Sequence, residues 1–569
     1  MKKIILILLL STYSVIAHSH PREMILAGGA MKICTSLSLG ACKDGKKEFS
    51  AARKIPRYQI KENNISVLLD PGFWNSRVGT PAITDLQAML VTAKQKARGE
   101  IHSANALVDI FEKICVGNAK TINCTREDAI VVWEKLLDEE QSFLLSAFEI
   151  PEFKNGKRLR EIASIDDSKT PHGAAIFKTF VEAAAKRSPG KRPRILFVTA
   201  SSADPYDAVD FYFSALQQAG AEPVWWPIDE ALSAAVYGKK SCNDLPQLRI
   251  EKLALANREL VFPDLTAMQK MVCENQQALA EFPLHAQGIF FSGGDQWRLR
   301  QAMFDEKDQP NLWLKNLRTA FERGEIVVGG TSAGTAVQSG VAMLSNGSSK
   351  HAVNRGAKIS APISPGCERT KRCPAGMEED DLSYWPTGGL ALVDSLVFDT
   401  HFSERARELR LLRLLHTANA KLGIGVDETS AMHLTRQPEH IEVRALGASG
   451  AWWFDTSNQQ HDKNKIKARV HYLAPGRDFI WKNNSLSSLV TTETITSKAV
   501  IEKTVIEDAL QDGALRAVAQ QMATNAVHQT TLKADTAKVT LTTTPDTTSW
   551  IGPQGQIGVT DLILELSRE

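Results

Sequence analysis

Residues 325–344, EIVVGGTSAGTAVQSGVAML, constrain the fold of this chain more than any other stretch. The apolar, β-branched run at 326–328 is typical of a buried strand, and the small residues after Gly329-Gly330 favour a helix. Ser332 lies between them in G-x-S-x-G, the pattern of a turn that exposes a nucleophilic serine at the end of a strand. We expect the backbone N–H groups of Gly294 and Ala333 to stabilise an oxyanion beside it.

The chain around this turn predicts an α/β fold. Apolar strands alternate with helical segments, which is typical of a doubly wound, mostly parallel sheet whose functional sites lie at the carboxyl ends of the strands. The predicted strands are residues 24–27, 194–198, 221–228, 288–291, 326–328, 396–398 and 423–426.

Two segments fall outside this alternation. Within residues 31–172, the apolar spacing from 83 to 149 is helical, as in DLQAMLVTAKQKA, ALVDIFEKI and REDAIVVWEKLL. Residues 481–569 are rich in threonine, with one helical stretch near 505–522. We therefore expect a catalytic domain over 18–480 with a largely helical insertion at 31–172, followed by a C-terminal extension of unknown role.

The N-terminus has the pattern of a secretory signal. Lys2 and Lys3 precede an apolar stretch at 4–16, and small residues favour cleavage after Ala17, with an uncleaved anchor as the alternative. No later stretch approaches 18 apolar residues, so we expect a soluble protein that is secreted or periplasmic. The net charge of +2 gives no indication of a nucleic-acid partner or of a membrane surface as partner.

Eight cysteines fall into four neighbouring pairs, which are Cys34 with Cys42, Cys115 with Cys124, Cys242 with Cys273 and Cys367 with Cys373. An even number of cysteines in an exported chain favours disulfides. Metal sites need tighter cysteine spacings with histidines nearby, so we predict no metal and no cofactor.

A nucleophilic serine needs a base and an acid that orients the base. His401 and Glu428 are the candidates, with Asp427 as the rival acid, because each directly follows an apolar strand and should reach the same sheet edge as Ser332. The order Ser, His, Glu argues against an α/β-hydrolase, whose acid precedes its histidine. His433 or His440 would restore that order, but neither leaves a clear strand end.

Four motifs in this order, GIFFSGGDQWRL, GGTSAGTA, DTHFSERARELRLL and GIGVDETSA, resemble those of the cyanophycinases. This serine peptidase family has a class I glutamine-amidotransferase-like fold, which is flavodoxin-like, and the resemblance covers residues 173–480 and 24–30. It implies Ser332 as nucleophile, His401 as base and Glu428 as acid. It further implies a substrate site that contains Gln296, Asp399, Thr400, Arg405, Arg407 and Arg410, with Thr400 standing where the family has glutamine.

Cyanophycinases cleave cyanophycin, a poly-aspartate backbone with arginine amide-linked to each β-carboxyl, into β-Asp-Arg dipeptides through an acyl-enzyme. The resemblance thus implies this polymer as the substrate. Arginine side chains suit the carboxylates of this polymer, and Asp399 suits its guanidinium groups. The alternative for the three arginines is a solvated helix face paired with Glu404 and Glu408.

Two other functions remain open from the sequence. A related exopeptidase for aspartyl or isoaspartyl dipeptides would share Ser332 and His401 but needs a closed pocket around a free terminus. A secreted binding protein with a dead site is the second, and the presence of all three catalytic residue types argues against it. The sequence also leaves a homodimer open.

Overall fold

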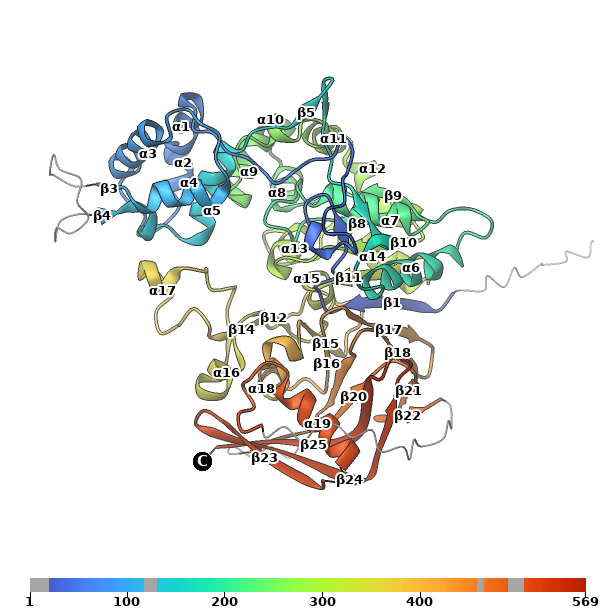
Figure 1. Cartoon of the computed structure of the whole chain (residues 1–569). Helices are drawn as coiled ribbons and strands as arrows, with labels where there is room; N and C mark the ends of the chain where they lie inside the picture. Colours follow the sequence, from blue (N-terminus) through green and yellow to red (C-terminus); the bar gives the residue numbers. More distant parts are fainter. Residues whose placement is uncertain (1–19, 117–129, 458–464, 490–505, 526, 569) are drawn as a thin grey trace, which may run out of the picture.

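The protein is described by a computed structural model that covers residues 20–116, 130–457, 465–489, 506–525 and 527–568. The expected signal segment, residues 1–17, lies outside the described residues. Figure 1 shows helices α1–α5 at the upper left and the C-terminal strands at the bottom, with the main sheet between them. None of the helices in the described ranges has the length and apolar character that crossing a bilayer requires.

The main sheet has nine strands in the order β22-β21-β18-β17-β1-β11-β10-β8-β9. The five strands from β1 to β9 are parallel, and four antiparallel strands extend the sheet beyond β1. The prediction of an α/β fold with a mostly parallel central sheet is thereby confirmed. The strands are β1 (Arg22–Ala27), β8 (Arg194–Val198), β9 (Glu222–Trp225), β10 (Gly288–Phe291), β11 (Val327–Thr331), β17 (Ser430–Arg436), β18 (Ile441–Gly447), β21 (Asp478–Lys482) and β22 (Ser485–Ser488).

Both faces of the parallel strands are buried. In β8, Leu196 and Val198 pack into one core, whereas Ile195 and Phe197 pack into the other, as the alternation of side chains along a strand requires. Helices α8, α13 and α14 contribute to the first core, and α6 and α7 to the second. Helices of this region are α6 (His172–Ala185), α7 (Val209–Gln218), α8 (Glu230–Tyr237), α9 (Leu245–Leu253), α10 (Arg258–Val261), α11 (Pro263–Glu274), α12 (Gln276–Glu281), α13 (Gln296–Met303) and α14 (Leu312–Glu322).

A helical unit with its own core precedes α6. Its helices are α1 (Glu62–Leu68), α2 (Pro71–Asn75), α3 (Ile83–Ala97), α4 (Ala104–Glu112) and α5 (Asp138–Phe148). The predicted helix in REDAIVVWEKLL is wrong where it is described, since Ile130–Val131 forms β4, paired with β3 (Cys115–Val116), and Val132–Lys135 is a 3-10 turn. Trp133 is nevertheless buried, because a single turn suffices to aim it at the core.

The second large sheet has seven strands in the order β15-β16-β19-β20-β25-β24-β23. The strands that precede His401 and Glu428 lie in this sheet, so the expectation that they share a sheet with Ser332 is wrong. The C-terminal segment contributes three of these seven strands, because β25 pairs with β20, β24 with β25, and β23 with β24. The strands are β15 (Leu396–Thr400), β16 (Leu422–Val426), β19 (Ala451–Asp455), β20 (Lys465–Leu473), β23 (Gln529–Ala534), β24 (Ala537–Ile551) and β25 (Ile557–Arg568), with helices α18 (Glu408–Thr417) and α19 (Ala514–Asn525) beside them.

Three of the four predicted cysteine pairs are disulfides in the structure, namely Cys34–Cys42, Cys242–Cys273 and Cys367–Cys373. Cys124 of the fourth pair lies outside the described residues. The Cys367–Cys373 loop lies in the chain between two strands of a three-stranded sheet, and it contacts the helical unit. There, Arg372 forms two hydrogen bonds of 2.7 Å to the buried carboxylate of Glu140. The strands of this sheet are β12 (Met343–Asn346), β13 (Ala357–Ile359) and β14 (Leu382–Trp385).

Candidate active site

Ser332 occupies a sharp turn between β11 and the short helix α15 (Ala333–Ala336). Its backbone has φ 53° and ψ −118°, a conformation that serine rarely adopts and that is found mainly where function demands it. The backbone N–H of Ser332 donates to the carbonyl of Ala27 at 3.0 Å, which fixes the turn at the end of β1. A Cβ at Gly330 would lie 2.5 Å from the carbonyl oxygen of Gly334, so the flanking glycines permit the turn.

His401 and Glu428 complete a chain of hydrogen bonds with Ser332. The distance from Ser332 Oγ to His401 Nε2 is 2.8 Å, and that from His401 Nδ1 to Glu428 Oε1 is 2.7 Å. Because an ionised carboxylate only accepts, it places the imidazole proton on Nδ1, and Nε2 accepts the hydroxyl proton of Ser332. These two hydrogen bonds have the geometry that a serine nucleophile, its base and an orienting acid require.

The three residues come from two sheets that meet at the end of β1. The N–H of His401, after β15, donates to Gly28 O at 2.8 Å, and the N–H of Thr429, after β16, donates to Gly29 O at 2.9 Å. Gly29 has φ +115°, and a Cβ there would collide with the imidazole of His401. Glycine at position 29 is therefore what lets the base approach Ser332.

The environment favours a neutral imidazole. Burial has the largest effect on the pKa of His401 and lowers it. The hydrogen bond to Glu428 raises this pKa, whereas the charges of Arg405 and Arg407 lower it further. A neutral His401 at physiological pH is the form that can accept the serine proton.

Asp427, the rival acid, points away from the imidazole and is fully buried. It accepts hydrogen bonds from Tyr472 Oη at 2.8 Å and Arg516 Nη1 at 2.7 Å, and it also accepts from the N–H of Ser403. The geometry therefore supports Glu428 over Asp427 as the partner of His401.

Two residues are expected to form the oxyanion hole, Ala333 beside the serine and Gly294, which follows Gly293 after β10. Ala333 follows Ser332 directly, and the N–H groups of Ala333 and Gly294 donate to no other group among the described residues. Gly293 packs against the serine, since a Cβ there would lie 3.9 Å from Ser332 Oγ, but its N–H donates to Tyr212 Oη at 3.2 Å.

The residues expected to bind substrate lie in different environments. Asp399 and Arg410 are both buried and bond each other through Arg410 Nε and Nη2, at 2.8 and 2.6 Å. These atoms form an internal pair that joins β15 to α18. Binding of substrate by Asp399 and Arg410 stays a prediction. Arg407 donates to Thr400 O at 2.7 Å, and burial together with the charge of Arg410 lowers its pKa to about 9.

The other three residues expected to bind substrate are Arg405, Gln296 and Thr400, and they lie in different surroundings. Arg405 is exposed and close enough to His401 for its charge to act on the ring. Gln296 begins α13 and donates to Leu344 O at 2.7 Å. Thr400 is buried, so its side chain presents little surface to a ligand.

A cavity of about 430 Å³ opens beside Ser332 and His401. This volume falls within the range of roughly 300–1,000 Å³ that is typical of small-ligand sites. Its lining comes from the segment after β1, from α7 and from the insertion, and none of the six predicted substrate residues belongs to it. The lining includes Lys32, Thr35, Ser38, Glu161, Phe211 and Tyr212.

Sequence reasoning missed these residues for two reasons. Strands β1 and β11 are parallel neighbours, so the segment that follows Gly29 lies near the serine turn after β11. This relationship could have indicated Lys32 and Thr35 as site residues. Glu161 lies more than a hundred residues further along the chain, and no spacing or motif connects it to Ser332.

No protein-family profile matches the chain. It is 31% identical over 159 residues to a cyanophycinase of Geminocystis herdmanii, which is 28% of this chain and 46% of that protein. It is 35% identical over 160 residues to a cyanophycinase of Synechococcus elongatus, covering 28% of this chain and 39% of that one. The chain thus spans less than half the length of either relative.

A crystal structure of a peptidase from an acI-B1 Actinobacterium aligns with a TM-score of 0.30 and 15% identity, over 56% of this chain and 92% of that one. This likeness is too remote to inform the site. Just over a quarter of this chain is thus similar in sequence to proteins named cyanophycinase.

Proposed function

We propose that this chain is a serine peptidase that hydrolyses cyanophycin to β-Asp-Arg dipeptides. The observation that carries the proposal is the chain of hydrogen bonds through Ser332, His401 and Glu428 beside an open cavity. The similarity to proteins named cyanophycinase supports the choice of polymer.

In the proposed mechanism, Ser332 Oγ attacks a backbone carbonyl carbon of the substrate while His401 Nε2 takes the hydroxyl proton. Glu428 stabilises the imidazolium ion, and the N–H groups of Gly294 and Ala333 stabilise the oxyanion. The C–N bond then breaks, His401 protonates the leaving amine, and an acyl-enzyme remains. Water activated by the same histidine hydrolyses that ester and regenerates Ser332.

Substrate carboxylates would bind near Arg405 and Arg407, whose charges act on the imidazole. Gln296 and the Thr400 backbone would shape the same side of the site. The Asp399–Arg410 pair would hold this wall in place rather than contact the polymer.

The finer fold assignment belongs to the same proposal. We infer a flavodoxin-like, class I glutamine-amidotransferase-like catalytic domain over 18–480, interrupted by the insertion at 31–172, with an extension from 481. The five parallel strands and the serine turn at the end of β11 support it.

Export is also proposed. Disulfides persist mainly in oxidising compartments, and three are present in the described chain. N-terminal sequencing of the protein released by its natural host should begin at His18, and a start at Met1 would contradict cleavage after Ala17.

The deciding experiment is to incubate the purified protein with cyanophycin and to identify the products by mass spectrometry. β-Asp-Arg dipeptides should appear with the wild type and be absent with Ser332→Ala. An aspartyl or isoaspartyl dipeptidase, which would use the same hydrogen bond between Ser332 and His401, is the second candidate. Cleavage of such dipeptides without any cleavage of cyanophycin would establish that alternative, and no reaction of Ser332 with a fluorophosphonate would indicate a dead site.

A further inference from the structure

Glu161 is the carboxylate in the lining of the cavity beside Ser332. It lies in the insertion, between β6 (Lys157–Arg158) and β7 (Ala163–Ser164). The proposed mechanism makes no use of it, and the motifs shared with the cyanophycinases do not include it.

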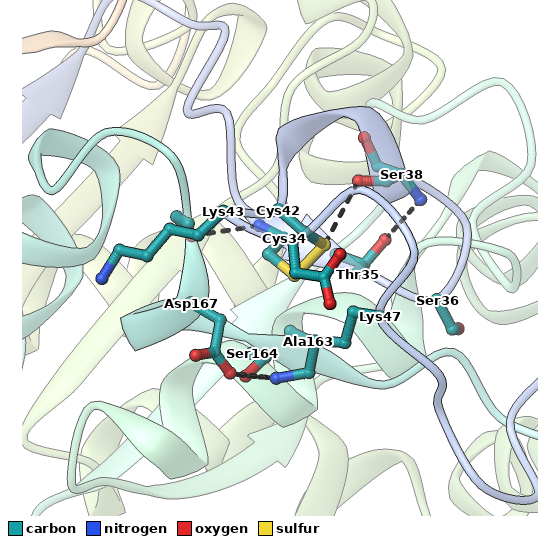
Figure 2. The surroundings of a disulfide bond; sticks show 12 residues. Cys34, Thr35, Ser36, Ser38, Cys42, Lys43, Lys47, Ala163, Ser164 and Asp167 are labelled. Carbon is teal, nitrogen blue, oxygen red and sulfur yellow. Dashed lines mark hydrogen bonds and ion pairs between the residues drawn. A yellow bond between two sulfur atoms is a disulfide. The ribbon is translucent and has the colours of Figure 1, made fainter.

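The wall that carries Glu161 is built firmly against the segment that follows β1. Strand β7 pairs with β2 (Cys34–Thr35), and the N–H of Ser36 donates to Ile162 O at 3.0 Å. Figure 2 shows the Cys34–Cys42 disulfide at this wall, with Ser164 and Asp167 beside it. Glu161 is therefore held at a fixed place in the cavity.

The carboxylate of Glu161 has no cation of its own among the described residues. The nearby guanidinium of Arg53 is already bonded to Glu149 at 2.7 Å and to Asp207, and that of Arg158 is bonded to Asp210 at 2.6 Å. Lys32 also lines the cavity, but it is exposed and forms no ion pair with Glu161.

Burial raises the pKa of Glu161 to about 7, and a hydrogen bond from Thr35 only partly opposes it. A carboxylate that is desolvated without a counter-charge gains most from a cation that a ligand brings.

Glu161 is also near the nucleophile. Its charge acts on Tyr212, whose pKa rises to about 12 mainly through burial. The hydroxyl of Tyr212 accepts the N–H of Gly293, and Gly293 packs against Ser332. A group bound at Glu161 thus lies in the same cavity as the bond that Ser332 would attack.

We propose that Glu161 is a specificity residue that binds the guanidinium group of the substrate beside the scissile bond. The inference rests on the proposed peptidase function. The cations Arg405 and Arg407 lie outside the cavity lining, so a polymer with alternating carboxylates and guanidinium groups would place opposite charges on the two sides of Ser332. The insertion, on this view, contributes to substrate choice.

The test compares oligomers of β-Asp-Arg with matched oligomers in which citrulline, an uncharged isostere, replaces arginine. The wild type should prefer arginine by on the order of 10- to 100-fold in kcat/KM, as expected for a charge-assisted hydrogen bond. Glu161→Gln should lose that preference, and circular dichroism together with residual cleavage of the citrulline oligomer checks that the variant is folded. Glu182→Gln, on the exposed face of α6, is the control and should retain the preference.

A Glu161→Gln protein that keeps the full arginine preference would overturn the inference. Fluorophosphonates that carry a guanidinium or a neutral group separate this result from failure of the proposed function, because they report on Ser332 without any polymer. If the wild type cleaves neither oligomer yet reacts faster with the cationic probe, and Glu161→Gln abolishes that difference, the cyanophycin assignment fails and the role of Glu161 stands. Equal rates with both probes in the wild type would count against Glu161.

Discussion

Arg516, in the C-terminal helix α19, donates hydrogen bonds from Nη1 to Asp427 at 2.7 Å and to Glu404 at 2.6 Å. Glu404 in turn accepts the backbone N–H of Glu428 at 2.9 Å. The C-terminal segment, whose role the sequence left unknown, thereby supports the residue that orients His401.

Arg516→Ala should destabilise the protein and lower its activity. Asp427 is fully buried, and the loss of its cation leaves an unpaired charge that costs about 3–5 kcal/mol in the free energy of unfolding. Urea denaturation measures the first effect and kcat the second. Arg323→Ala is the control, since its ion pair with Glu325 is exposed and should contribute less than about 1 kcal/mol. Equal stability of the two variants would show that the Arg516 pair contributes nothing.

Substitution of the three hydrogen-bonded residues should abolish turnover without unfolding the protein. We expect losses on the order of 10³-fold or more in kcat for Ser332→Ala and His401→Ala, and a smaller loss for Glu428→Gln, because an orienting acid matters less than nucleophile and base. Circular dichroism verifies the fold, and cyanophycin turnover gives the rates. Wild-type turnover by Ser332→Ala would exclude it as nucleophile.

The pH dependence follows from His401. Only the neutral imidazole accepts the serine proton, so kcat/KM should fall as the pH drops through the pKa of His401, which burial places below its usual 6.5. Arg405→Ala removes a charge that lowers this pKa, so the acid limb of the profile should move to higher pH. A shift toward lower pH would contradict this assignment of the limb, and Arg413→Ala, further along α18, should leave the limb unmoved.

The arginines of the 401–413 segment should separate into two classes. Arg410→Ala removes both guanidinium hydrogen bonds to the buried Asp399, leaves it only Arg407 at 3.7 Å, and should lower stability by about 3 kcal/mol. Arg405→Ala removes an exposed side chain and should raise KM for cyanophycin with little change in stability. Thermal unfolding together with KM measures both, and a stable Arg410→Ala protein would mean that its pairing is not structural.

Sequence patterns were sufficient for those features that depend on neighbouring residues. Strands β8 and β10 have the predicted bounds because each is a short apolar run between turn residues, and the disulfides join cysteines that are near in sequence. The serine turn is local in the same way, since glycines on both sides of Ser332 permit its positive φ.

Features that depend on distant parts of the chain could not be predicted. The strand before His401 has the same apolar pattern in either sheet, so nothing in residues 396–400 indicated that β15 pairs with β16 in the second sheet rather than beside β11. Likewise, a charged residue such as Arg410 has the same sequence signature whether it faces a substrate or an internal Asp399.

The Cys34–Cys42 disulfide connects stability with substrate binding, and its removal should show both. Replacing both cysteines by serine reopens a short loop and should cost roughly 2–3 kcal/mol of stability. Because Thr35 lies in that loop and lines the cavity, KM for the β-Asp-Arg oligomer should rise as well. The matched control is Cys242→Ser with Cys273→Ser, which opens a longer loop remote from the cavity lining and should cost more, roughly 3–4 kcal/mol, with KM unchanged. Urea denaturation and steady-state kinetics on both variants check this. If KM rises in both variants, and more in the variant that loses more stability, the Cys34–Cys42 loop has no specific role in binding.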